Sequence, residues 1–157
     1  MLPIATLTRV LILALLATTP VAPQAQGVTD QVRTWFMTEY APLWRDLGQL
    51  DPARLTPFWA DDFRDHPIDT ESSLWPNTTE RWQRRLQSYK SEGLRGSTVL
   101  VVQVEAISGR AALIRTVWRD LGPDGPIEGL YCGTFIAGRF GQDWKFTNYF
   151  TVECSSK

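Results

Sequence analysis

Large apolar residues recur every three to four positions between residues 30 and 47, which is the spacing of one face of a helix. Asp30 stands where a helix cap is expected, and Pro42 lies inside the repeat. Because proline removes one backbone donor and clashes with the preceding turn, we expect a kink there. The apolar stripe consists of Val32, Trp35, Phe36, Tyr40, Leu43, Trp44 and Leu47.

Two shorter helices are expected before residue 97. Asp51-Pro52 is a typical helix start, and this second helix is predicted to end near Trp59 or Asp61. Asn77, with Glu80 three residues later, resembles a capping box that opens the third helix. The buried side of the third helix is predicted to contain Trp82, Leu86 and Tyr89.

From residue 97 the apolar period changes to two, as in strands. Segments 98–107, 110–121, 127–140 and 143–154 are separated by glycine-containing turns and predict an antiparallel meander. Odd positions, which include Tyr131, Phe135 and Tyr149, are expected to meet water or a second subunit. The even, core-facing positions include Leu100, Val102, Val104, Ala112, Ile114, Thr116, Trp118, Leu130, Cys132, Thr134, Ile136, Trp144, Phe146, Asn148, Phe150 and Val152.

This order of elements predicts one α+β domain, residues 28–157, in which three helices cover one side of the sheet. Residues 1–27 have another character, because Arg9 precedes an apolar run and Ala25-Gln-Gly27 is a small-x-small pattern suited to signal peptidase. We interpret them as a secretory signal peptide and expect a secreted or periplasmic protein. The apolar run is too short for a membrane anchor.

The chain is nearly neutral and rich in aromatic residues. It has 16 Lys and Arg against 17 Asp and Glu, with seven Trp and seven Phe. A weakly acidic domain disfavours nucleic acid as a partner, and the aromatic content indicates a heavy core or a roomy cavity. One histidine and two cysteines do not make a usual zinc site, and no phosphate-binding glycine loop is present. We therefore expect neither a metal nor another cofactor.

Cys132 and Cys154 flank the last predicted hairpin, and an oxidising compartment favours a disulfide between them. A three-residue loop that pairs Phe140 with Trp144 places both cysteines on one face as diagonal neighbours, whereas a two-residue loop places them on opposite faces. Diagonal neighbours are roughly 7 to 8 Å apart, so a bond requires a bulge. A disulfide and two separate thiols both remain open at this point.

The sequence "FWADDFRDHPID" after the second helix and "GQDWKFTNYF" in the last strand resemble the nuclear-transport-factor-2-like superfamily, in particular its SnoaL-like branch. The motif positions are Trp59 to Asp62, His66-Pro67 and Trp144 to Phe146. The resemblance implies a cone-shaped fold with a pocket at its wide end for a mainly apolar ligand. It also implies frequent dimerisation through the outer sheet face, and it is specific to fold rather than to function.

The only histidine, His66, lies among carboxylates in the stretch from 58 to 72. If a strand begins there, Asp62 and His66 share one side and form a candidate catalytic acid–base pair. The alternative is structural: the carboxylates bind backbone amides at the turn, and His66 pairs with a carboxylate near the surface.

Polar residues on the predicted inward face form a second set of candidates. Trp118 and Asp120 share one side at the end of their strand, and Tyr40 on the first helix offers a hydroxyl. The resemblance implies a polar residue on the last long strand facing the cavity, and Asn148 fits that place. We predict ligand contacts for these four residues, while Thr116 and Thr134 bind either a ligand or each other and water.

These observations lead to three hypotheses. The first is an exported SnoaL-like domain that binds a small, largely apolar molecule in its cone. The second is a cyclase- or isomerase-type enzyme that uses Asp62 and His66 for proton transfer. The third is a non-catalytic module that forms a homodimer, or binds a partner, through the outer sheet face.

Overall fold

The computed structural model describes residues 23–68 and 71–154, so most of the predicted signal peptide lies outside the described residues. Helix α1, Pro23–Trp35, begins before Asp30. Asp30 is therefore not the cap that we expected; its exposed carboxylate accepts a hydrogen bond from Gln26 Nε2 at 3.0 Å. None of the helices in the described ranges is long and apolar enough to cross a bilayer.

The helix changes geometry where the sequence predicts a kink at Pro42. After α1 it continues as a π turn, Phe36–Tyr40 (η1), and then as a tighter 3-10 turn, Ala41–Arg45 (η2). Since Pro42 cannot donate to Thr38, the change of helix type accommodates the missing hydrogen bond. The predicted apolar stripe is confirmed, because five of its members are buried and Trp35 and Trp44 pack against the same core.

The second predicted helix is two short 3-10 turns, Pro52–Arg54 (η3) and Thr56–Phe58 (η4). Asp51 does cap the first turn, since its carboxylate accepts from Ala53 N at 2.9 Å. Prolines at both turns limit their length. Strand β1, Trp59–His66, follows directly.

Helix α2, Thr79–Ser91, is capped by Thr78 rather than by Asn77. Thr78 Oγ1 accepts from Arg81 N at 3.3 Å. Asn77 instead joins three segments: its Nδ2 donates to the carbonyl oxygens of Thr56 and Trp59 at 2.8 and 2.9 Å, and its Oδ1 accepts from Trp82 Nε1 at 2.9 Å. The buried positions Trp82 and Leu86 are confirmed.

The strands form one curved, mixed sheet in the order β2-β1-β7-β6-β4-β3, with a short β5 paired to β4. The predicted meander is confirmed for β3, β4, β6 and β7, which pair antiparallel. The expectation of a wholly antiparallel sheet is wrong, because β1 pairs with β7 in parallel. The remaining strands are β2 Ser73–Pro76, β3 Gly96–Ser108, β4 Ala111–Gly122, β5 Gly125–Pro126, β6 Tyr131–Phe140 and β7 Asp143–Val152.

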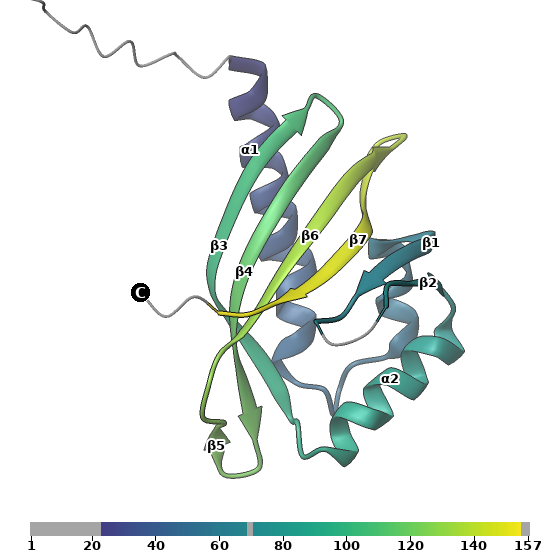
Figure 1. Ribbon diagram of the computed structural model, residues 1–157, viewed down its shortest axis with the longest axis vertical. Helices are drawn as coiled ribbons and strands as arrows, with labels where there is room; N and C mark the ends of the chain where they lie inside the picture. The colour runs from purple at the N-terminus through teal and green to yellow at the C-terminus, as the bar shows by residue number, and fades with distance from the viewer. Residues whose placement is uncertain (1–22, 69–70, 155–157) are drawn as a thin grey trace, which may run out of the picture.

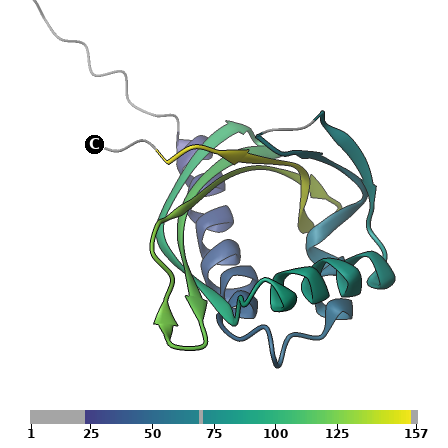
Figure 2. The ribbon, with the colours of Figure 1, turned by 60° about the horizontal axis from the view of Figure 1, so that its bottom comes forward.

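The sheet curls around the first helical segment, and α2 lies across the open end (Figures 1 and 2). The end of the first helical segment meets the start of β3, where Leu47 N donates to Arg95 O at 2.8 Å. Gly96 permits this approach, because a Cβ at that position would overlap the carbonyl of Arg45. The result is an α+β cone, as predicted.

Two bulges, and the connection between β4 and β6, decide which side chains face the helices. Leu100 in β3 and Thr147 in β7 are extra residues in their ladders. Because of the second bulge, Tyr149 points inward and Asn148 does not. In β6 the inward positions are odd, since Trp118 pairs with Tyr131. The predicted inward face is thus confirmed for β4 and wrong for β6 and for the end of β7.

Once the extra residue Thr147 is counted, the register of the last hairpin also explains how the cysteines meet. The hairpin loop has two residues, since Phe140 pairs with Asp143, but the extra residue shifts the register so that Cys132 pairs with Val152. Cys154 then lies two residues further along the same face. The two cysteines form a disulfide with a Cα–Cα distance of 5.3 Å.

Candidate functional site

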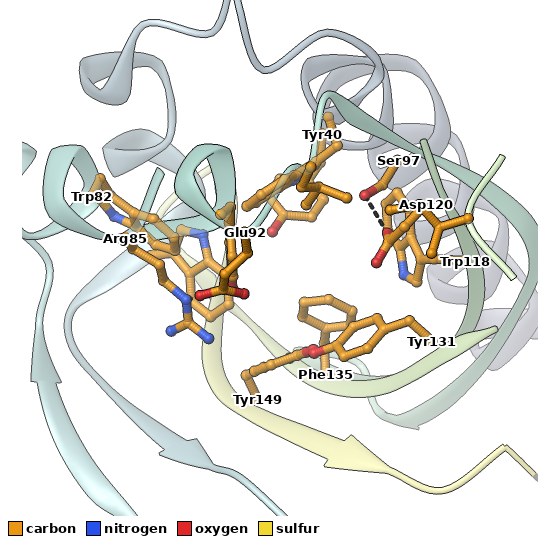
Figure 3. Close-up of a pocket in the computed structure, with 15 residues that line it drawn as sticks. Tyr40, Trp82, Arg85, Glu92, Ser97, Trp118, Asp120, Tyr131, Phe135 and Tyr149 are labelled. Atoms are coloured by element: carbon orange, nitrogen blue, oxygen red, sulfur yellow. Dashed lines mark hydrogen bonds between the residues drawn. The ribbon is translucent and has the colours of Figure 1, made fainter. Parts of the chain in front are cut away.

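A cavity of about 340 Å³ lies at the wide end of the cone, between α2, the end of the first helical segment and the inner face of β4, β6 and β7 (Figure 3). Most of its lining residues are aromatic. Tyr40, Trp59, Phe135 and Tyr149 are buried and pack on one another, with Phe135 and Tyr149 ring centroids 4.8 Å apart. The volume falls within the range of small-molecule sites.

Two tyrosine hydroxyls contribute polar groups to this aromatic cavity. The hydroxyl of Tyr40 points into it (Figure 3), and burial raises the pKa of this phenol well above its usual value. Tyr131 lies 3.2 Å from Thr151, measured between the two hydroxyl oxygens, and burial raises its pKa to about 12. Both groups therefore remain neutral near pH 7.

Asp120 supplies a carboxylate that faces the cavity (Figure 3). It lies opposite Ser97 in the β3–β4 ladder. Ser97 is buried, and its Oγ donates to Asp120 Oδ1 at 2.6 Å. This bond fixes the carboxylate in place and leaves Oδ2 for a second partner.

Trp118 forms part of the same wall and is held by a short chain of hydrogen bonds. Its Nε1 donates to Thr116 Oγ1 at 2.8 Å, and Thr116 Oγ1 donates to Gly133 O at 3.0 Å. Thr116 is thus satisfied by its neighbours and does not line the cavity. Its role is to orient the indole ring.

Arg85 on α2 closes another side of the cavity. Its Nη1 lies 2.9 Å from Asp65 Oδ2, its Nε donates to the Tyr89 hydroxyl at 2.7 Å, and its guanidinium stacks over Trp75 at 4.8 Å. Burial alone would lower the pKa of Arg85, but Tyr89 and Asp65 outweigh this effect and raise it. The group stays cationic, with its charge balanced by Asp65.

The predicted pair Asp62 and His66 does not lie in the cavity. Both residues are on the side of β1 opposite Phe63, where Asp62 is exposed. The His66 ring stacks on Phe150 at 4.1 Å, and its Nε2 lies 3.3 Å from Asn148 Nδ2. The geometry therefore gives Asp62 and His66 no access to a molecule bound inside the cone.

Of the predicted ligand contacts, Tyr40, Trp118 and Asp120 line the cavity, whereas Asn148 faces away from it. Its position is explained by the Thr147 bulge. Arg85 also lines the cavity, and sequence reasoning did not single it out. A signal was present, because residue 85 lies three positions after Trp82 and four before Tyr89, on the buried side. Ser97, Tyr131, Phe135, Tyr149 and Glu92 were also missed as lining residues.

The described residues contain no group of three His, Cys, Asp or Glu side chains close enough to hold a metal ion. The cavity's polar groups are instead carboxylates, tyrosine hydroxyls and one paired guanidinium. Such groups orient a ligand by charge and hydrogen bonding.

Comparison with known proteins connects this geometry to a family. A family profile described as "NTF2-like protein (DUF6841)" matches residues 29–154. The comparison with curated proteins gives no significant match.

Solved structures with the same fold share little sequence with the chain. An NTF2-like protein of unknown function from Pseudomonas putida has a TM-score of 0.61 at 14% identity, over 81% of this chain and 87% of that one. A cystatin-like domain from Nostoc punctiforme has a TM-score of 0.61 at 9% identity, over 82% and 79%. A protein from Novosphingobium aromaticivorans, provisionally named a scytalone dehydratase, has a TM-score of 0.56 at 15% identity, over 82% and 87%.

Proposed function

The chain belongs to the NTF2-like family (DUF6841), and from that premise we propose that it binds a small, largely apolar molecule in the cavity under α2. One observation carries the proposal: aromatic walls surround a carboxylate, Asp120, that is held in place by a buried serine. Apolar walls with a few fixed polar groups are the usual composition of a small-molecule site.

The proposal is tested by a ligand screen with a matched pair of variants. Leu94→Trp places a large ring against the cavity, while Leu74→Trp makes the same change on exposed β2. Compounds found by thermal shift should stabilise the wild type and Leu74→Trp and lose their effect on Leu94→Trp, and crystals should show them beside Asp120. A broad screen without such compounds, or compounds that bind both variants equally, would refute the proposal.

We also propose that this binding takes place outside the cytoplasm. The signal-peptide pattern in residues 1–27 and the Cys132–Cys154 disulfide both support export. Expression of the full chain in a bacterial host with a secretion pathway should give a periplasmic or secreted product that begins at Val28. A cytoplasmic product that retains residues 1–27 would contradict export and leave the binding proposal standing.

A further inference from the structure

The cavity lining contains more negatively charged groups than positively charged ones. Its lining contains two carboxylates, Asp120 and Glu92, and one guanidinium, Arg85. The guanidinium is neutralised by Asp65, whose Oδ2 lies 2.9 Å from Arg85 Nη1 and which is itself buried. The carboxylates of Asp120 and Glu92 therefore leave the cavity with a negative field.

The two carboxylates differ in what surrounds them. Glu92 is exposed and accepts a hydrogen bond from Ser88 Oγ at 2.8 Å, so solvent screens it. Asp120 is partly buried, beside Trp118 and opposite the Tyr40 hydroxyl (Figure 3). A charge in such surroundings interacts more strongly with a ligand than an exposed one does. Asp120 is thus the main group that selects between ligands by the sign of their charge.

The aromatic walls also favour a positively charged ligand. The faces of Trp and Tyr rings carry negative electrostatic potential and attract cations. Tyr40 and Tyr131 remain neutral because burial raises the pKa of both phenols. Their rings therefore add to the attraction for a cation instead of requiring a counter-ion.

Other ligand classes fit the cavity less well. An anion would face Asp120 and Glu92, and the Arg85 atoms Nε and Nη1 already donate to Tyr89 and Asp65. A purely apolar molecule would remove water from the Asp120 carboxylate without replacing its interactions, which is costly. The indole N–H groups of Trp44 and Trp59 have no partner within the described part of the chain, and both are buried in the wall.

We propose that the ligand carries a positively charged nitrogen, as a protonated amine or a quaternary ammonium group on an apolar body, with Asp120 as its counter-ion. This inference rests on the proposed function and narrows its ligand class. Ser97 acts as a positioning residue, because its hydrogen bond holds Asp120 Oδ1 and directs the other oxygen into the cavity.

The test compares two probes of nearly the same shape, phenyltrimethylammonium and its neutral counterpart tert-butylbenzene. Binding is measured by ligand-observed NMR and by tryptophan fluorescence on the folded protein with its disulfide intact. We expect the wild type to prefer the cation by about tenfold or more. This preference should decrease as salt is added, since a charge interaction is screened.

Three isosteric variants locate the charge that matters. Asp120→Asn should lose most of the preference for the cation and bind tert-butylbenzene at least as tightly as the wild type does, because a neutral amide costs less to desolvate than a carboxylate. Glu92→Gln should change the preference only slightly, because Glu92 is exposed, and Asp62→Asn on the outer side of β1 should not change it. Melting curves of all three variants verify that each is folded.

The outcomes separate this inference from the proposed function. Equal affinity of the wild type for the two probes, or an unchanged preference in Asp120→Asn, would overturn the inference and leave the proposed function intact. Binding of neither probe would also overturn the inference. In that case the ligand screen with Leu94→Trp decides the proposed function independently.

Discussion

Asn77 holds together the segments that carry the cavity, and its replacement should destabilise the protein far more than loss of a helix cap. Its side chain makes three hydrogen bonds, to the carbonyl oxygens of Thr56 and Trp59 and to Trp82 Nε1, at 2.8 to 2.9 Å. Trp82 is 2% exposed, so its indole donor has no access to water when Asn77 is removed. Asn77→Ala therefore removes three hydrogen bonds and leaves the buried Trp82 donor unpaired, while the Thr56 carbonyl keeps its bond from Trp59 N.

The expected loss follows from these bonds. A neutral hydrogen bond contributes about 1 kcal/mol net, and an unpaired buried donor costs about 1 to 3 kcal/mol. Asn77→Ala should lower the free energy of unfolding by about 3 to 4 kcal/mol, which is a large part of the total stability of a small domain. Thr78→Ala, which removes the actual cap of α2, should cost about 1 kcal/mol.

Urea denaturation followed by tryptophan fluorescence measures both losses under oxidising conditions. Asn77→Asp separates the two possible roles, because Asp is as good a helix cap as Asn but has no amide donors. At Asn77 it would place a negative charge beside the carbonyl oxygens of Thr56 and Trp59. An Asn77→Asp protein as stable as the wild type, or an Asn77→Ala loss no larger than that of Thr78→Ala, would refute the reasoning.

Three further outcomes are expected. Replacing Cys132 and Cys154 by serine should lower the free energy of unfolding by about 3 kcal/mol, because the disulfide closes a loop with a sequence separation of 22; equal stability of oxidised and reduced wild type would contradict this. Gly96→Ala should cost about 3 kcal/mol or prevent folding, since its Cβ would overlap the carbonyl at the end of the first helical segment, and a thermal melt unchanged from wild type would exclude that contact. For Tyr131 the pKa is about 12 in the folded protein against a usual 10.0, so the unfolded chain loses this proton first and stability should fall as the pH rises from about 10 to 12. Phenolate absorbance and urea titrations of the wild type and of Tyr131→Phe check this, and the variant should lose less stability over the same range.

The parts of the fold that the sequence predicts are those with a local, repeated signal. The helical stripe from Val32 to Leu47 and the four long strands repeat their periods over ten or more residues, and these elements appear in the structure. The pairing of β1 with β7 joins His66 to Phe150, far apart in the chain. Strand β1 is short and rich in charge, so nothing local identifies it as the parallel partner of the last strand.

The site was predicted only in part, because the register of each strand determines which of its side chains point into the cavity. Trp118 and Asp120 lie on a regular stretch of β4 and were placed correctly. In β6 apolar residues occupy both parities, as Phe135 and Ile136 show, so the alternation does not reveal the inward side. In β7 one extra residue, Thr147, moves Tyr149 into the wall and Asn148 out of it. A bulge has no characteristic residue composition, so the alternation of apolar and polar residues along the sequence does not reveal it.

Removal of the Thr147 bulge would affect the shape of the cavity wall but not which residues line it. Loss of this one residue would leave the partners of Asn148 and Val152 in β6, and thus the cysteine pairing, unchanged. The strand would nevertheless straighten, since bulges bend and twist the strand that carries them. Deletion of Thr147 would therefore change the curvature of the cavity wall without replacing any residue that lines it. The curvature of the cavity wall and the charge at residue 120 are thus set by different positions of the chain.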